Sequence, residues 1–299
     1  MTLPNFLIIG AGRSGTTSLY HYLRQHPQIF MSPIKETSFF AFENGQNQFR
    51  FPIRSLEAYQ ALFSRVTVER AIGEASPLYL VQSEAADRIK RHIPDARLIA
   101  LLRDPAERVH AAWLAAVRQG TERQSLSAAL LAYRRSVGRE STHANLFEPG
   151  FYCRNLNRYI EVFGRERLSI HLYDDFRSDV GAVLRRIFRF LDVDDGFVPD
   201  VSVRYNASGL PRNTLLDAVM RPRRITRDLK ASLPDPLRRF VVTLGTRINR
   251  RNLVKPDLSR ELRRELIALY REDILALQNL LRRDLSSWLT VPDDAQPPA

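Results

Sequence analysis

Residues 6–17 read Phe6-Leu7-Ile8-Ile9-Gly10-Ala11-Gly12-Arg13-Ser14-Gly15-Thr16-Thr17, and this stretch predicts the fold of the 299-residue chain. A short apolar run leads into three glycines and then into a helical pattern in which Leu19 and Leu23 are four residues apart. His26-Pro27 ends that pattern. The order of strand, glycine-containing turn and helix is typical of a loop whose backbone amides, at a helix N-terminus, face an anion.

The positively charged residue of this loop does not stand where a nucleoside triphosphatase has its lysine. Such an enzyme needs a lysine after the second glycine of the pattern, to reach the β- and γ-phosphates. Thr16 stands at that place, and Arg13 lies three positions earlier, inside the loop. A tight turn whose glycines serve backbone geometry alone is the alternative interpretation.

Strand and helix signals alternate over the first two thirds of the chain. The strand predicted at 97–102 is too apolar to face water, which suits a parallel sheet covered on both sides. We predict an α/β fold, with a P-loop-like doubly wound parallel sheet flanked by helices and a site at the carboxyl ends of the strands. The other predicted elements are strands at 6–9 and 168–173 and helices at 16–25, 56–63, 84–92, 106–119 and 180–191.

After Pro211 the strand signal fades, and a long helix rich in leucine and polar residues is predicted over 260–285. We expect residues 1–212 to form the core. Residues 213–291 are expected to be a helical C-terminal extension packed on that core as part of the same domain, and 292–299 a solvated tail.

Most of the net charge of +12 lies in one window. Residues 221–255 hold eleven basic and two acidic side chains, which leaves the rest of the chain nearly neutral and predicts no nucleic-acid partner. One hypothesis is that this window contacts an anionic acceptor or, peripherally, an acidic membrane surface. The alternative is a solvated basic face that affects only solubility.

Composition excludes several other classes. No stretch approaches the length of a membrane span, and the single cysteine, Cys153, cannot form an internal disulfide. The six histidines show no metal-ligand spacing, so we expect no metal. Because the first residues lack a signal-peptide pattern, a cytoplasmic location is expected.

The loop and three later segments together resemble the sulfotransferases that use 3′-phosphoadenosine 5′-phosphosulfate (PAPS), in particular their carbohydrate-type and bacterial branch. The loop is similar to the one that binds the 5′-phosphosulfate in that family. The resemblance extends through 205–212 to Trp288 and covers nearly the whole chain. The three later segments are Pro33-Ile34-Lys35-Glu36-Thr37-Ser38-Phe39-Phe40, Gly73-Glu74-Ala75-Ser76-Pro77 and Leu101-Leu102-Arg103-Asp104-Pro105-Ala106-Glu107-Arg108.

The resemblance implies roles for individual residues. Glu36 matches the general base that takes the acceptor proton, in an environment that Phe39 and Phe40 would make apolar. Arg13 would stabilise the leaving phosphate, and Arg103 would hold the 3′-phosphate. The residues implied to bind the donor are Gly12, Arg13, Ser14, Gly15, Thr16, Thr17, Arg103 and Arg212.

Three positions depart from the family pattern. Where the family often has a lysine, this chain has Arg13, which keeps the charge but not the proton-donor tuning of a lysine. The serine expected eight residues after Arg103 is Ala111, and a lysine common after the Glu74 position is Ala75.

Other interpretations also stay open. One is that Glu36 pairs with Lys35 or caps the following turn, and Glu74 is a second candidate base. Arg103 as a salt-bridge partner of Asp104 or Glu107 is the alternative to phosphate binding.

The resemblance implies an enzyme that moves a sulfuryl group from PAPS to a hydroxyl or amine of a small-molecule, glycan or lipid acceptor and leaves the product PAP. One alternative is a P-loop metabolite kinase, against which the missing lysine argues. The other is a catalytically decayed protein that binds PAP or another nucleotide.

Overall fold

Strand β1 (Phe6–Gly10) lies inside a five-stranded parallel sheet of order β2-β3-β1-β4-β5. The computed structural model describes residues 2–42, 53–136, 143–203, 205, 209–211 and 253–291. Because β1 has β3 on one side and β4 on the other, the chain changes direction across the sheet at β1, where α/β folds hold their ligands. The remaining strands are β2 (Ile29–Met31), β3 (Ala71–Ala75), β4 (Arg97–Leu102) and β5 (Leu168–Leu172).

Alternate residues of the strands enter two separate cores. Leu7 and Ile9 of β1 belong to the larger core, and Phe6 and Ile8 belong to the smaller one on the opposite face. This follows from the two-residue repeat of a strand, and burial on both sides accounts for the continuous apolar run. The predicted doubly wound α/β fold is therefore confirmed.

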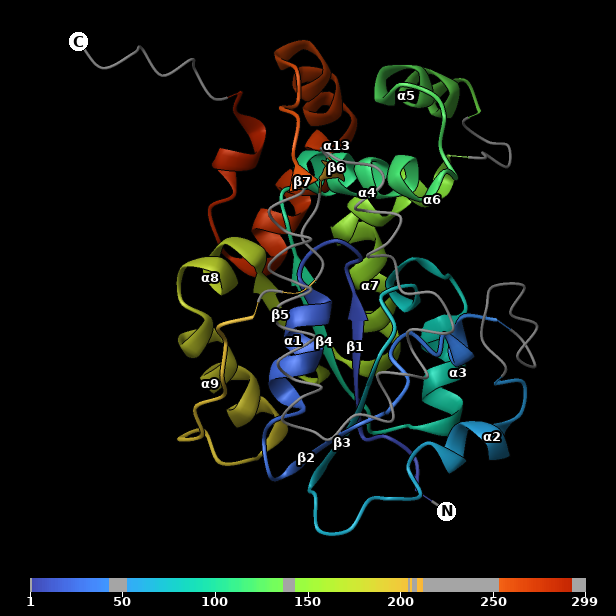
Figure 1. The fold of residues 1–299 in the computed structure, drawn as a ribbon, viewed down its shortest axis with the longest axis vertical. Coiled ribbons are helices and arrows are strands. Elements are labelled where there is room, and N and C mark those ends of the chain that lie inside the picture. The colour runs from blue at the N-terminus through green and yellow to red at the C-terminus, as the bar shows by residue number, and fades with distance from the viewer. Residues whose placement is uncertain are drawn as a thin grey trace.

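Helices cover both faces of the sheet (Figure 1). Residues of α1, α8 and α9 enter the smaller core, whereas α3, α4, α7 and α13 contribute to the larger one. The helices are α1 (Thr16–Leu23), α2 (Leu56–Ala61), α3 (Ala85–His92), α4 (Pro105–Gln119), α5 (Leu126–Arg135), α6 (Ala144–Phe147), α7 (Tyr152–Phe163), α8 (Tyr173–Ser178), α9 (Val180–Leu191) and α13 (Arg260–Leu281). Short 3-10 helices are η1 (Phe39–Ala41), η3 (Tyr79–Val81), η4 (Glu148–Gly150), η5 (Arg165–Arg167) and η6 (Ser286–Leu289).

Several predicted boundaries were wrong by a few residues. Helix α4 begins one residue earlier than predicted, at Pro105, because the Asp104 carboxylate accepts hydrogen bonds from the first free amides. The strand predicted to end at Tyr173 ends at Leu172, and Tyr173 opens the short helix α8. Strands β2 and β3 and helix α5 were not predicted, because their short or mixed sequences carry no clear period.

The predicted long C-terminal helix is α13, and it ends at Leu281 rather than at 285. Arg282 adopts a left-handed backbone with φ 51° and terminates it. Leu266, Tyr270 and Leu277 are buried in the same core as the sheet, and the Tyr270 hydroxyl donates a hydrogen bond to the carbonyl of Phe147. Helix α13 therefore contributes directly to the larger core.

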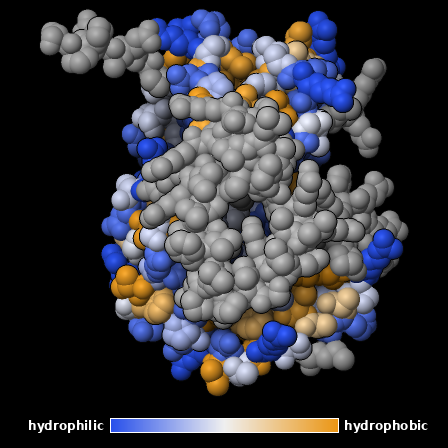
Figure 2. All heavy atoms as spheres, in the orientation of Figure 1, coloured by the Kyte–Doolittle hydropathy of each residue, from blue (hydrophilic) through white to orange (hydrophobic). Residues whose placement is uncertain are grey.

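The expected boundary between a core at 1–212 and a C-terminal extension at 213–291 stays a prediction. Residues 212–252 and the expected tail at 292–299 lie outside the described residues. Figure 2 shows that hydrophilic side chains prevail among the coloured residues of one face. The most exposed large apolar residues among those described are Val68 and Val198. Among the described helices, none has the length and apolar character needed to cross a membrane.

Candidate functional site

The glycine-containing loop joins β1 to α1, as predicted. Gly15 has φ 96°, a left-handed conformation that favours glycine, and a side chain there would come within 3.2 Å of the Tyr173 ring. Helix α1 starts at the next residue without a side-chain cap, and Thr16 and Thr17 of its first turn line the cavity.

A cavity of about 660 Å³ opens at the carboxyl ends of the strands, large enough for a nucleotide-sized ligand. The donor-binding residues predicted from the sequence divide into three groups. Ser14, a residue of the loop itself, is fully buried, and Arg212 lies outside the described residues. Gly12, Arg13, Gly15, Thr16, Thr17 and Arg103 all line the cavity, together with the predicted base Glu36.

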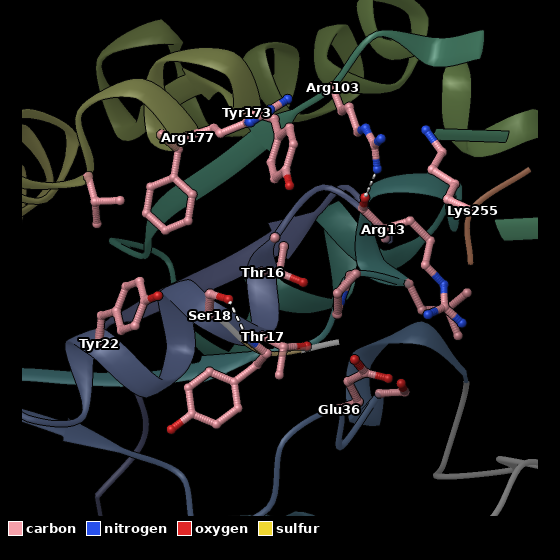
Figure 3. Close-up of a pocket in the computed structure, with 18 of the residues that line it drawn as sticks. Arg13, Thr16, Thr17, Ser18, Tyr22, Glu36, Arg103, Tyr173, Arg177 and Lys255 are labelled. Atoms are coloured by element: carbon pink, nitrogen blue, oxygen red, sulfur yellow. Dashed lines mark hydrogen bonds between the residues drawn. The ribbon is translucent and has the colours of Figure 1, made fainter. Parts of the chain in front are cut away.

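Arg13 and Glu36 approach the cavity from different segments. Arg13 has a left-handed backbone with φ 70°, and Figure 3 shows its side chain extending from the loop toward Glu36. Partial desolvation lowers the pKa of Arg13, and the Glu36 carboxylate opposes that shift. The guanidinium still carries its charge at neutral pH, because arginine loses its proton only far above that range.

Glu36 lies in a more polar setting than the sequence suggested. Its side chain is 50% exposed and its carboxylate forms an ion pair with Lys35. The rings of Phe39 and Phe40 pack on Tyr59 instead, with ring centroids 4.6 and 5.1 Å from that of Tyr59. Glu36 thus lines the cavity and also makes the salt bridge that was its alternative interpretation.

The backbone around Glu36 is held against the end of β3. Glu36 itself has φ 65°, and its amide donates to the carbonyl of Ala75 at 2.9 Å. Two residues on, the amide of Ser38 donates to the hydroxyl of Ser76 at 2.9 Å. Between them the Thr37 hydroxyl donates to the carboxylate of Glu74. These three contacts fix the segment that carries the predicted base.

Glu74 is fully buried and lies beneath that segment rather than in the cavity lining. Burial raises the pKa of its carboxyl to about 7, although hydrogen bonds from Thr37, Tyr79 and Ser76 and the charge of Lys35 act in the opposite direction. The position supports the interpretation in which Glu74 organises the end of the strand.

Arg103 leaves the end of β4 and turns toward the loop. Its guanidinium donates to the carbonyl of Arg13 at 3.4 Å and to the Glu107 carboxylate at 3.1 Å, and it lies 5.0 Å from the centre of the Tyr173 ring. The expected salt bridge and the expected place in the cavity are thus both present. One does not preclude the other, because a guanidinium has five N–H donors.

Other lining residues were missed by the sequence analysis. Tyr173 and Arg177 come from the unpredicted helix α8, and Tyr205 and Lys255 come from segments with no strong local pattern. Lys255 is the last residue of the basic window, and the sequence showed it only as part of a charge run. No short-range signal could have assigned it to this cavity, since it lies 152 residues after Arg103.

Two of the departures from the family pattern are buried alanines. Ala75 in β3 and Ala111 in α4 are both fully buried, so neither presents a polar atom to the cavity. Within the part of the chain that the structure describes, no group of three or more His, Cys, Asp and Glu side chains is placed to hold a metal ion.

Comparison with known proteins gives a consistent result. Residues 3–203 match the model of the family described as sulfotransferase domain. The crystal structure of a sulfotransferase from Alicyclobacillus acidocaldarius superposes with a TM-score of 0.72 and 30% sequence identity, over 96% of this chain and 99% of that one.

Curated relatives match over part of their own length. The membrane-associated sulfotransferase kil1 of Dictyostelium discoideum is 39% identical over 110 residues, which are 36% of this chain and 22% of that protein. Human heparan sulfate glucosamine 3-O-sulfotransferase 6 is 27% identical over 221 residues, which are 74% of this chain and 61% of the relative.

Proposed function

The chain belongs to the sulfotransferase family, and from this premise we propose that it transfers a sulfuryl group from PAPS to a hydroxyl or amine of an acceptor. The observation that carries the proposal is that the β1–α1 loop, Arg13 and Glu36 all line one cavity. An anion site and a carboxylate that can accept a proton therefore face the same space. Transfer needs both at once.

The cavity fits a donor with two anionic groups and a flat base. The amides at the start of α1, together with Arg13, offer a site for the phosphosulfate end. Arg103, next to that loop, offers a site for the 3′-phosphate. Apolar and aromatic side chains for the adenine line the cavity at Tyr22, Tyr173, Phe176, Val180 and Tyr205.

PAPS supplies an activated sulfuryl group. Glu36 takes the proton of the acceptor hydroxyl or amine while the new bond to sulfur forms. The bond from sulfur to the phosphate oxygen breaks, and PAP leaves. Arg13 and the loop amides stabilise the charge that grows on that oxygen, where fixed dipoles and cations contribute most. Lys35 forms an ion pair with the Glu36 carboxylate at the edge of the cavity that Glu36 lines.

The two alternatives predict different ligands. A kinase would need the lysine that Thr16 replaces, and the family to which the chain belongs is not one of kinases. A decayed nucleotide-binding protein would hold PAP without transferring a group. The presence of Glu36 at the cavity speaks for a working enzyme.

We propose a glycan, lipid or other small molecule as the acceptor, supported by relatives named for heparan sulfate and other carbohydrates. The lone cysteine supports a reducing compartment such as the cytoplasm. Peripheral contact with an acidic membrane through 221–255 stays a prediction, because 221–252 lie outside the described residues.

The test is transfer from PAPS with and without the predicted base. A cell extract incubated with the protein and PAPS should yield a product heavier by one sulfuryl group, and Glu36→Gln should abolish it. PAP binding, measured by calorimetry, should change little, because the carboxylate acts on the acceptor. Loss of both binding and transfer would make Glu36 a structural residue. Binding of ATP with magnesium but not of PAP would favour the kinase.

A further inference from the structure

The carboxylate of Glu74 contacts the segment that carries Glu36, although Glu74 does not line the cavity. It is fully buried in β3, and its Oε2 accepts from the hydroxyl of Thr37 and, at 3.4 Å, from that of Ser76. The Ser76 hydroxyl in turn accepts from the amide of Ser38 at 2.9 Å. A single oxygen atom therefore holds the two residues that follow Glu36, one directly and one through a hydroxyl.

The backbone on both sides of Thr37 has a conformation that L-residues rarely adopt. Glu36 has φ 65° and Ser38 has φ 51°, so both lie in the left-handed region although neither is a glycine. Residues persist in this region where the surrounding contacts determine their conformation. Thr37, between the two, is fully buried. The turn at 36–38 therefore depends on the groups that hold it from below.

Tyr79 provides a second contact to the Thr37 hydroxyl. Its Oη lies 3.3 Å from Oγ1 of Thr37 and accepts from the amide of Phe40 at 3.4 Å. Because the proton of Thr37 goes to Glu74, the Tyr79 hydroxyl donates its own proton to Thr37. The amide of Phe39 also donates to Oγ1 of Thr37, at 3.4 Å. The Thr37 hydroxyl thus connects the turn to Glu74 and to Tyr79 at once.

The carboxylate belongs to a well-supported part of the fold. Strand β3 lies between β2 and β1, and just after it the amide of Ser76 donates to the carbonyl of Ile8 in β1 at 3.1 Å. Strand β1 continues directly into the loop that carries Arg13. The position of Glu36 relative to Arg13 is therefore set through the two strands and the hydrogen bonds of Glu74.

The second oxygen of the Glu74 carboxyl allows this contact in either protonation state. Oε1 is buried and has no hydrogen-bond partner among the described residues. A proton on Oε1 leaves Oε2 free to accept from Thr37. A glutamine amide can make the same contact through its oxygen, whereas leucine, of similar size, has no acceptor. The two substitutions therefore separate the hydrogen bond from the volume of the side chain.

We propose that Glu74 is a positioning residue for the transfer reaction, and that through the hydroxyl of Thr37 it holds the turn that presents Glu36 to the acceptor. The inference rests on the proposed function, in which Glu36 takes the acceptor proton. It assigns to Glu74 a role that acts through another residue, in place of the role of a second base.

Hydrogen exchange followed by mass spectrometry measures the hold on the turn without any substrate. Peptides covering 36–41 should exchange about 10-fold faster or more in Thr37→Val and Glu74→Leu, because the turn then opens more often. Thr37→Ser and Glu74→Gln keep a donor and an acceptor, so their exchange should match the wild type. Thr121→Val is the matched control, because the exposed Thr121 hydroxyl donates to the carbonyl of Ala116 and does not line the cavity.

Transfer from PAPS to the acceptor in a cell extract measures the consequence for the reaction. The apparent kcat should fall about 10- to 100-fold in Thr37→Val and Glu74→Leu, because a small displacement of a catalytic group costs a factor of this size. The KM for PAPS and the calorimetric affinity for PAP should stay unchanged, since neither substitution alters the β1–α1 loop. Glu74→Gln and Thr37→Ser should retain most of the wild-type rate.

The remaining outcomes separate the two proposals. If Glu74→Gln abolishes transfer as Glu74→Leu does, the carboxylate itself reacts and the positioning role is overturned. If Thr37→Val and Glu74→Leu keep either the wild-type exchange or the wild-type kcat, the inference is overturned and the proposed function stands. Parallel losses of PAP binding and transfer would indicate a general loss of structure and also overturn it. A wild type that yields no sulfated product would overturn the proposed function, while the exchange would still decide whether Glu74 holds the turn.

Discussion

The wild-type protein is expected to lose stability as the pH rises from mildly acidic to neutral, and the substitution Glu74→Gln is expected to prevent that loss. The Glu74 carboxyl is fully buried, and its pKa is raised from an ordinary 4.5 to about 7. The folded state therefore keeps the proton in a range where the unfolded chain has already lost it. Stability from this group is fully present below pH 4.5 and is lost as the pH rises through 7.

The size of the effect follows from the shift. The raised pKa of Glu74 corresponds to about 3 kcal/mol of unfolding free energy, since each pH unit of difference is worth about 1.4 kcal/mol. Above pH 7 the wild type carries a buried negative charge held by the Thr37 hydroxyl. Glutamine fills the same space without that charge, so its stability should not show this decline.

Urea unfolding at pH 5, 6, 7 and 8 measures the difference between the two proteins. The free energy of unfolding of Glu74→Gln relative to the wild type should rise by about 2–3 kcal/mol across the series, which begins just above the pKa of the unfolded carboxyl. Glu161→Gln, on the exposed side of α7, is the control and should show no such rise. A Glu74→Gln difference that stays constant with pH would refute the argument, because the carboxyl would then have the same proton affinity in both states.

Three further changes test other parts of the structure. Arg263→Leu should destabilise the protein by about 3–5 kcal/mol in urea unfolding, because it leaves Asp104 as a buried charge without its partner; a loss under about 1 kcal/mol would contradict this. Gly73→Ala should cost about 1–3 kcal/mol, since its new methyl group would lie 2.1 Å from the Phe6 ring, and an unchanged melting temperature would show that the sheet yields easily. Burial and nearby cations lower the pKa of His21 to about 4, so the unfolded chain binds the proton first and the wild type should lose stability as the pH falls from 6.5 toward 4. His21→Gln should reduce that decline in melting temperature, and an unaltered dependence on pH would argue against it.

The loop and the principal strands were predictable because their signals are local. Residues 6–17 contain a buried strand, the glycines of the turn and the start of a helix within twelve positions. The strand at 97–102 is equally clear, because a central parallel strand must be apolar on both faces. Six of the eight residues that the family resemblance implies for donor binding line the cavity, and so does Glu36.

The setting of Glu36 could not be predicted in the same way. Phe39 and Phe40 are its neighbours in sequence, but the left-handed backbone of Glu36 and Ser38 turns the chain between them. The rings pack on Tyr59 and leave the carboxylate beside Lys35. Proximity along a chain does not give the direction of a side chain when the backbone departs from a regular helix or strand.

The sequence by itself thus determined the strands β1, β4 and β5, the glycine-containing loop and the family, because an apolar run, a turn and a motif each need only a few consecutive residues. The tertiary structure alone decided which charges meet. Arg103, Glu107 and Lys255 share one site although Lys255 lies 148 residues after Glu107. Such contacts depend on the path of the whole chain, on the pairing of β6 (Leu210–Pro211) with β7 (Leu253–Val254) and on the packing of α13 against α4, and no window of the sequence contains that information.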